Sequence, residues 1–296
     1  EQSQLLYNGT AAEWSGTLKA QTEEGQIAEL KNSDCQFFWY QKTGDEYTPV
    51  PNYSAPVDIG SYKLVIKAEN NDYLGTQEII FDIVKRDISD AVVILGEPLI
   101  FNGTVQTQTL ESIKTGALLL TDRDYIVEEN AGCEAGNYIL KITGTGNFTG
   151  TVEKKFTITP LPVKLFWNVQ TFVYNGEKQG ILADVSNAVN GWEVSVNGYV
   201  NETAVNAGTY TAQAISLDNP NYTLAGGTNV SEEYTIEKLD ITDRTDLEIL
   251  MGESLTYNGT IQIQKINSVK IGNLNVVYEI SDNSATDAGA YTLTIT

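Results

Sequence analysis

The sequence predicts an all-β protein made of tandem β-sandwich modules. Strand-forming and turn-forming residues such as Thr, Val, Ile and Asn are abundant in its 296 residues, together with 16 Tyr and 25 Gly. Two short motifs each occur four times along the chain, and a third occurs three times. Because motifs that recur at long spacing indicate a recurring structural unit, we expect four modules of one type.

The first motif ends in Asn-Gly after a short apolar run. Asn-Gly between apolar flanks favours a type I′ turn, so the motif predicts a hairpin of two strands. Its copies start roughly 70 to 95 residues apart, which is the size of a β-sandwich domain. The four copies are LLYNGT at 5–10, LIFNGT at 99–104, FVYNGE at 172–177 and LTYNGT at 255–260.

The second motif is a small residue, Gly, any residue and Tyr. Alternating apolar residues follow it, as in Tyr62, Leu64 and Ile66, and this period of two predicts a half-buried strand. The pattern resembles the tyrosine corner of immunoglobulin-like sandwiches, in which the ring packs in the core and the hydroxyl bonds to upstream backbone. We therefore expect immunoglobulin-like modules. The four copies are IGSY at 59–62, AGNY at 135–138, AGTY at 207–210 and AGAY at 288–291.

The third motif predicts a hairpin whose second strand closes each sandwich. Its copies run from 71 to 83, 146 to 158 and 219 to 236. The fourth repeat reaches Thr296 without one. Two interpretations stay open: the repeat is truncated, or a neighbouring chain donates the strand. The expected modules are 1–84 (longer and aromatic-rich), 85–159, 160–237 and 238–296 (incomplete), and their short links predict an elongated arrangement.

Taken together, these motifs resemble the tandem Ig-like repeats of bacterial surface proteins known as the MBG/YDG type. The second repeat, from FNGTVQTQ to the GNFTGTVEKKFTI string, is the nearest to that family's usual pattern. The first repeat departs from it, because a longer segment precedes its corner glycine. The resemblance implies a secreted or wall-attached bacterial protein whose repeats act as spacers or adhesive modules, and it provides no catalytic residues.

Charge and composition exclude several classes of function. The net charge of −21 argues against nucleic-acid binding and against docking to anionic membranes. No apolar run of 18 residues exists, so we expect no membrane insertion in this segment. Histidine is absent, which excludes Ser-His and Cys-His nucleophiles, and the two cysteines cannot form a zinc site alone. We therefore predict a protein that is not an enzyme and has no cofactor.

Calcium is the metal that the sequence leaves open, because it binds clustered carboxylates. The alternative is that these acids belong to ordinary polar turns. For Cys35 and Cys133, two free thiols or a bridge between modules both stay open, and Lys-Asn isopeptide bonds within modules are a further alternative. The calcium candidates are Asp122, Asp124, Asp243, Asp246 and Glu248.

Aromatic residues are densest in QFFWYQ at 36–41. Strand alternation puts Phe37 and Trp39 on one face and Phe38 and Tyr40 on the other, so one face is core. The other face has three interpretations: packing, contact with the next module, or a ligand site. The candidate ligand residues are Phe38, Trp39 and Tyr40.

The function that these observations favour is a non-catalytic, extracellular bacterial stalk, spacer or adhesin-type segment. The alternatives are a module that binds a surface glycan or a host or neighbour-cell protein through the first repeat, and an accessory region of a secreted polysaccharide-acting enzyme. The sequence leaves the oligomeric state open.

Overall fold

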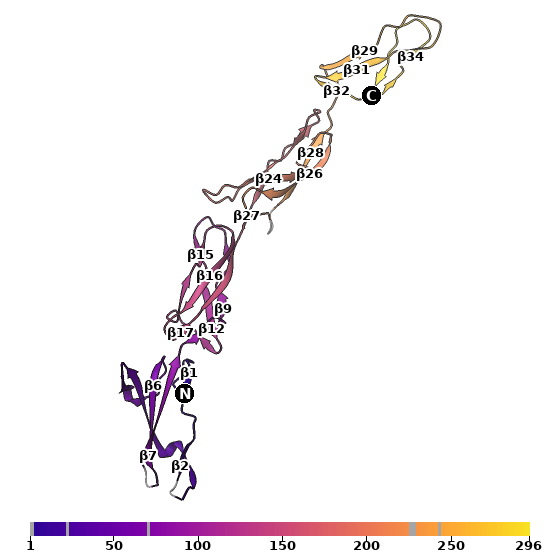
Figure 1. Ribbon diagram of the computed structural model, residues 1–296. Coiled ribbons are helices and arrows are strands. Elements are labelled where there is room, and N and C mark those ends of the chain that lie inside the picture. Colours follow the sequence, from indigo (N-terminus) through magenta and orange to yellow (C-terminus); the bar gives the residue numbers. More distant parts are fainter. Residues whose placement is uncertain (1–2, 22–23, 70–71, 225–228, 242–243) are drawn as a thin grey trace. The chain divides into compact units, whose positions relative to one another are not determined.

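The computed structural model describes residues 3–21, 24–69, 72–224, 229–241 and 244–296. In these residues the chain is all-β, with two short 3-10 helices, η1 (Asn32–Asp34) and η2 (Pro51–Tyr53), among its strands (Figure 1). The chain divides into two compact units, Glu1–Leu161 and Pro162–Thr296. The sheets of the described residues fall within the ranges 1–84, 85–159, 160–237 and 238–296, which we call modules 1 to 4.

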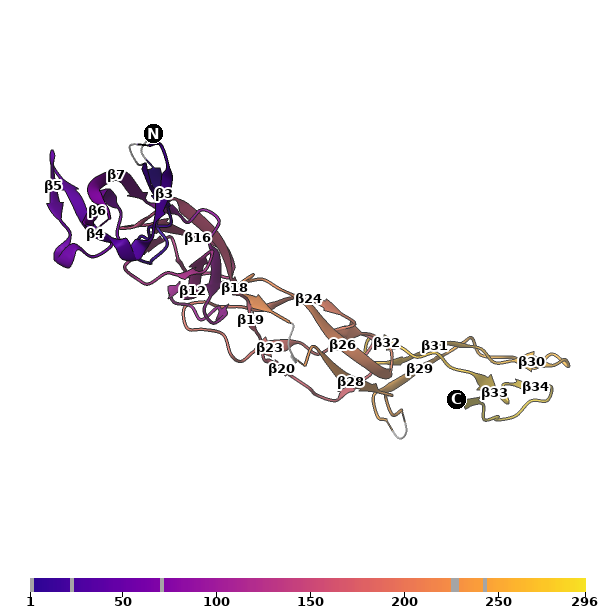
Figure 2. The same ribbon diagram turned by 90° about the horizontal axis from the view of Figure 1, so that it is seen from below.

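Module 1 is a five-stranded sheet faced by a hairpin (Figures 1 and 2). Along β6 the side chains alternate between buried and half-buried positions, as the sequence predicts. Its core contains Trp39, Tyr62, Leu64, Ile66, Phe81 and Ile83. In sheet order, the strands are β1 (Ser3–Leu6), β7 (Leu74–Val84), β6 (Gly60–Glu69), β4 (Cys35–Thr43) and β5 (Glu46–Pro49), and the hairpin is β2 (Leu18–Gln21) with β3 (Ile27–Leu30).

Module 2 has two sheets and two short strand pairs. Its larger sheet is β10 (Leu99–Ile100), β18 (Thr151–Thr159), β16 (Gly136–Gly144) and β14 (Tyr125–Glu128). The second is β13 (Leu118–Leu119), β12 (Leu110–Thr115) and β9 (Val92–Leu95). The pairs are β11 (Gln106–Thr107) with β15 (Ala131–Gly132), and β8 (Arg86–Asp87) with β17 (Phe148–Thr149). Apolar side chains from both sheets, including Ile113, Leu140 and Ile142, are fully buried.

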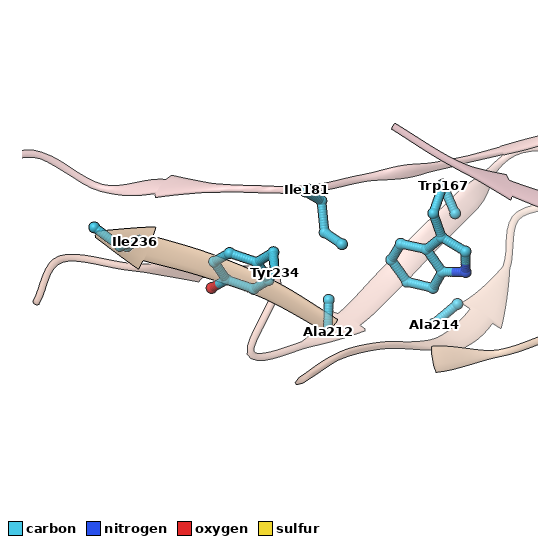
Figure 3. Close-up of a cluster of buried hydrophobic side chains, with 7 residues drawn as sticks. Trp167, Ile181, Ala212, Ala214, Tyr234 and Ile236 are labelled. Atoms are coloured by element: carbon cyan, nitrogen blue, oxygen red, sulfur yellow. The ribbon is translucent and has the colours of Figure 1, made fainter. Parts of the chain in front are cut away.

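Module 3 repeats this plan. Its core packs the Trp167 indole against small and branched side chains from several strands (Figure 3). The main sheet is β21 (Phe172–Val173), β28 (Ser231–Glu237), β26 (Gly208–Leu217) and β24 (Val196–Val200). The other strands are β19 (Leu161–Pro162), β20 (Leu165–Trp167), β22 (Gln179–Gly180), β23 (Ala183–Val185), β25 (Thr203–Ala204) and β27 (Tyr222–Thr223).

Module 4 is the least complete. One sheet consists of β29 (Leu247–Met251), β31 (Ile266–Ile271) and β32 (Leu274–Asn275). The remaining strands form two short pairs, β30 (Gln262–Ile263) with β34 (Ser284–Ala285), and β33 (Ile280–Ser281) with β35 (Thr294–Ile295). Among its described residues, no strand takes the place that β7, β18 and β28 hold in the other modules.

The tyrosine corner is confirmed in its hydrogen bonding. Each corner hydroxyl donates to the carbonyl oxygen four residues earlier: Tyr62 to Asp58 at 2.9 Å, Tyr138 to Glu134 at 2.8 Å, Tyr210 to Asn206 at 2.8 Å and Tyr291 to Asp287 at 2.9 Å. Burial of the rings holds for three of the four. Tyr62 is buried and Tyr138 and Tyr210 are half-buried, but Tyr291 is 59% exposed, so the prediction of a buried ring is wrong there.

A second contact explains this difference. In modules 1 to 3 the corner ring stacks on an aromatic ring directly across from it on the closing strand, at centroid distances of 5.2 to 5.7 Å. Stacked aromatic pairs are worth about 0.5–1.5 kcal/mol beyond the area they bury. The pairs are Tyr62 with Phe81, Tyr138 with Phe156, and Tyr210 with Tyr234. Tyr291 has no closing strand to cover it among the described residues.

The hairpin predicted at Asn-Gly is wrong. In modules 1 to 3 the strand before the turn pairs parallel with the closing strand, as Leu99 does with Ile158, and in modules 2 and 3 the strand after the turn pairs in another sheet. A type I′ turn needs positive φ at both central residues, yet only the glycine has it, for example Gly103 at 77°. The Asn102 side chain instead accepts hydrogen bonds from the backbone and hydroxyl of Thr104. This Asx turn carries the chain from one sheet to the other.

The closing strand in each third motif is confirmed, but the motif is not a hairpin in itself. The antiparallel partner of the closing strand is the corner strand that precedes the motif, as in β6 with β7, β16 with β18, and β26 with β28. Asn71, where the first copy of the third motif begins, lies outside the described residues.

Candidate functional site

The aromatic segment 36–41 lies in β4, and its faces divide as strand alternation predicts. Phe37 and Trp39 point into the core of module 1, where the Trp39 ring meets Phe81 edge-on at 5.8 Å. Trp39 is only 7% exposed, so it is a core residue and not a ligand contact. Phe38 and Tyr40 lie on the opposite face and are half-buried.

A third ring covers these two on the outer face. Tyr53, from η2, packs edge-on against Phe38 at 5.3 Å and against Tyr40 at 5.6 Å, and it is 41% exposed. Its backbone has φ of 51°, and Asn52 before it has φ of 57°. Two successive non-glycine residues in the left-handed region are uncommon and cost energy, so packing of the Tyr53 ring holds this turn in place.

A lysine places positive charge beside the same rings. The Lys63 ammonium lies 5.6 Å from the centroid of Tyr40 and 5.1 Å from that of Tyr47, and it pairs with Glu78 at 3.1 Å. Such cation–π contacts are favourable by about 0.5–1 kcal/mol at exposed sites. We call Phe38, Tyr40, Tyr47, Tyr53 and Lys63 the outer aromatic cluster. It offers flat ring faces, phenol hydroxyls and one cation, which are groups that suit ligand binding.

Sequence reasoning found Phe38 and Tyr40 from local density alone. It missed Tyr47, Tyr53 and Lys63, because their approach depends on strand pairing. Lys63 lies directly across from Tyr40 in β6, and Tyr47 lies in β5 on the other side of β4. Which residues become cross-strand neighbours depends on the register in which the strands pair, and the local sequence does not specify that register.

A second cluster joins modules 1 and 2 inside the first unit. Asn147 of module 2 accepts a hydrogen bond from the Ile59 backbone N–H at 3.1 Å and donates one to Asp58 Oδ1 at 2.9 Å. Asp58 is also the residue whose carbonyl holds the Tyr62 hydroxyl. One side chain therefore ties module 2 to the tyrosine corner of module 1.

Two further contacts strengthen this junction. The Tyr7 ring meets Phe148 edge-on at 5.3 Å, and the Arg86 guanidinium donates to the Tyr7 carbonyl at 3.4 Å. Gly9 has a φ of 76°, which favours glycine, and an added Cβ there would lie 2.9 Å from Leu118 Cδ2 of module 2, so the two modules approach closely at this turn. Sequence patterns do not predict this clamp, because Asn147 lies in a segment typical of an ordinary polar turn.

The calcium candidates do not converge. The Asp122 carboxylate accepts from the Tyr125 hydroxyl, the Asp124 carboxylate accepts from Thr121, and Asp246 pairs with Arg244 at 2.7 Å. These are polar-turn contacts. Asp243 lies outside the described residues, and within those described no three His, Cys, Asp or Glu side chains gather as a metal site.

Both cysteines are free and half-buried. Burial, and then the neighbouring Asp34 carboxylate, raise the pKa of the Cys35 thiol. A raised pKa lowers the thiolate fraction, which makes the Cys35 thiol less reactive than that of a free cysteine.

Comparison with known proteins adds little. No family model matches the chain, and no curated protein matches it. Among solved structures it is similar to the chain of a crystal structure of Drosophila N-cadherin EC1-4, at 12% identity over 95% of this chain and 86% of that one. The TM-score of 0.17 is too low to carry an argument. In the part of the chain that the structure describes, no helix is long and apolar enough to span a membrane.

Proposed function

We propose that this chain is a non-catalytic segment of an extracellular bacterial surface protein, in which immunoglobulin-like modules act as a stiff spacer. The observation that carries the proposal is the clamp between modules 1 and 2. Lys85 alone separates β7 from β8, and the Asn147, Arg86 and Tyr7 contacts brace the junction from several sides. A short link braced by side chains limits bending, which is what a spacer needs.

The stiffness of this junction is directly measurable. Spin labels at Gln77→Cys and Glu153→Cys, in a Cys35→Ser, Cys133→Ser background, report the distance between modules 1 and 2. We expect one narrow distance distribution in the unaltered junction. Asn147→Ala removes both hydrogen bonds to the corner of module 1, so the distribution should broaden.

Asn137→Ala is the matched control, because the Asn137 side chain accepts from Thr157 within module 2 and takes no part in the junction. Its distribution should stay narrow. A broad distribution in the chain with an intact junction would reject the stiff spacer.

The outer aromatic cluster favours a second candidate, binding of a surface glycan by module 1. Sugar rings present apolar C–H faces that pack on aromatic rings, and their hydroxyls suit the phenols and the Lys63 ammonium. Tyr53 is the most informative residue to change, because it is exposed and contacts both Phe38 and Tyr40.

A glycan array probed with the intact chain tests this candidate. Retention that disappears in Tyr53→Ala and persists in Phe166→Ala would support it, because Phe166 is an exposed ring of module 3, 67% accessible, outside the cluster. Trp39→Ala is unsuitable, since it removes core packing. If Tyr53→Ala and Phe166→Ala both still bind glycan, or if the intact chain binds none, the outer aromatic cluster is not a glycan site. The spacer then stays the only function proposed.

A further inference from the structure

Six Asn-Gly pairs occur in the chain, and they differ in what holds the asparagine side chain. All six asparagines are exposed, so access of water does not distinguish them. In an Asn-Gly pair the glycine nitrogen reaches the side-chain carbonyl carbon of the asparagine easily, because glycine has no Cβ to block the approach. The pairs begin at Asn8, Asn102, Asn175, Asn190, Asn197 and Asn258.

Five of the six side chains are held by hydrogen bonds to Oδ1. In the four copies of the Asn-Gly motif, the backbone N–H two residues on donates to Oδ1 at 2.9 to 3.0 Å. In three of these copies the threonine hydroxyl donates as well, as Thr104 does to Asn102 at 2.8 Å. Asn197 lies in β24 and accepts from the Ser216 hydroxyl at 2.7 Å. Each of these carboxamides must break its bonds before it can turn toward the next nitrogen.

Asn190 is the exception, because its side chain makes no hydrogen bond to any residue that the structure describes. It occupies the first central position of a turn in which the Trp192 N–H donates to the Val189 carbonyl at 2.9 Å. Gly191, at the second central position, has φ of 79°, whereas Asn190 has no positive φ, and this combination is that of a type II turn. The turn is closed through the backbone alone, so the Asn190 carboxamide is free to rotate.

One buried hydroxyl fixes both ends of this turn. The Tyr222 hydroxyl accepts from the Val189 N–H at 2.9 Å and donates to the Trp192 carbonyl at 2.7 Å. Tyr222 is 4% exposed, so it anchors the turn to the body of module 3. Only Asn190 and Gly191 lie between the two anchored residues. A change in the length of the backbone between the anchors must therefore disturb the bonds to Tyr222.

We propose that Asn190 is the site at which the folded chain undergoes spontaneous deamidation through a succinimide, and that the Asx turns protect the motif asparagines. The Gly191 backbone nitrogen attacks Asn190 Cγ, and the new C–N bond closes the succinimide ring. The side-chain nitrogen leaves as ammonia and takes the Gly191 proton with it. Water then opens the ring at either carbonyl carbon and gives aspartate or isoaspartate. The inference goes beyond a spacer, because it identifies a site of covalent modification in module 3.

Each product changes the turn in a defined way. Aspartate adds one negative charge to a chain whose net charge is already −21. Isoaspartate also routes the backbone through the former side chain, which adds a carbon between Val189 and Trp192. The Tyr222 hydroxyl cannot then keep both of its bonds at their present lengths. The Val189 amide should therefore exchange its hydrogen faster in the isoaspartate form.

The test incubates the folded chain at mildly alkaline pH in water enriched in heavy oxygen and then follows each Asn-Gly peptide by mass spectrometry. Heavy oxygen enters only where a succinimide has been hydrolysed during the incubation. We expect Asn190 to be labelled at least about twofold faster than Asn102, the ratio that corresponds to one weak hydrogen bond in an exposed turn. An enzyme that methylates isoaspartate identifies the product at Asn190.

Two controls separate the effect of structure from that of local sequence. Thr104→Val removes the hydroxyl that donates to Asn102, so labelling of Asn102 should rise while that of Asn190 stays the same. In the chain unfolded by guanidinium no turn is held, and the six rates should become equal. Labelling of a motif asparagine as fast as that of Asn190 in the folded chain would overturn the proposal. The same order of rates in the unfolded chain would overturn it too. Neither result bears on the junction of modules 1 and 2.

Discussion

Modules 2 and 4 carry the same Asn-Gly and corner motifs but differ in how far their cores are buried. In both, the Asx turn forms, with the Asn102 and Asn258 side chains each accepting from a threonine two residues on. In both, the corner hydroxyl bonds to the carbonyl four residues back. Of the two modules, only module 2 has a closing strand among the residues that the structure describes, and only there is the corner ring covered. Local motifs thus form by themselves, whereas burial of the core needs the last strand.

The base of the module also differs between modules 2 and 4. Ile88 at the start of module 2 has no exposed surface, and its backbone N–H donates to Thr149 in the loop before the closing strand. Its counterpart Ile241 in module 4 is 42% exposed. That loop also supplies Asn147 and Phe148 to the clamp with module 1. One segment therefore seals the core and braces the junction.

The largest expected difference is between Leu140→Ala and Leu293→Ala. Removing a fully buried leucine side chain costs about 2–5 kcal/mol, so module 2 should be strongly destabilised. Leu293 is only half-buried, so its loss should cost under about 1 kcal/mol, because little cavity forms. Hydrogen exchange of amides in β16 and in residues 289–295 measures each module separately. Equal effects would show that module 4 is closed in solution.

The next effect comes from the corner hydroxyls. Tyr138→Phe removes a hydrogen bond of 2.8 Å beside a stacked ring pair and should cost about 0.5–1.5 kcal/mol of module stability. Tyr291→Phe should cost less, because water reaches the exposed Asp287 carbonyl and takes the place of the hydroxyl. Hydrogen-exchange rates of the backbone amides next to Tyr138 and Tyr291 measure both losses of stability. A larger loss of stability in Tyr291→Phe than in Tyr138→Phe would show that exposure of the ring does not weaken the corner hydrogen bond.

Loss of the Asx-turn hydrogen bonds should lower stability by a smaller amount, and by the same amount in modules 2 and 4. Asn102→Ala removes two hydrogen bonds of 2.8 and 2.9 Å, and Asn258→Ala removes three of 2.8 to 3.3 Å, each within an exposed turn. Because water can replace these bonds in an exposed turn, each substitution should cost at most about 0.5 kcal/mol in total, with no dependence on the closing strand. Backbone amide shifts of Thr104 and Thr260 provide the readout. A loss confined to module 2 would show that the turn depends on tertiary packing.

The smallest expected effect is a loss of module 2 stability at acidic pH. The Ser89 hydroxyl and backbone N–H donate to Asp87 at 2.6 and 2.8 Å, and these bonds lower the pKa of the Asp87 carboxyl below its ordinary value of 3.8. A carboxyl whose pKa is lower in the folded state stabilises that state above the unfolded pKa. The contribution is lost as the pH falls through the folded pKa. Module 2 should therefore lose slight stability below pH 3.8, and Asp87→Asn should remove that dependence. Carboxyl NMR titration gives the check.

Sequence patterns determined the fold class, the corner hydrogen bonds and the alternation of β4 and β6. Each of these depends on residues a few positions apart, such as Tyr62 and Asp58 or Trp39 and Phe38, so spacing alone carries the information. Tertiary structure decided the rest. It set the parallel pairing of the Asn-Gly strands, the rings stacked on the corner tyrosines, the approach of Tyr53 and Lys63, and the Asn147 clamp. These contacts join segments far apart in the chain, and their register follows from how whole strands pack, which no short motif specifies.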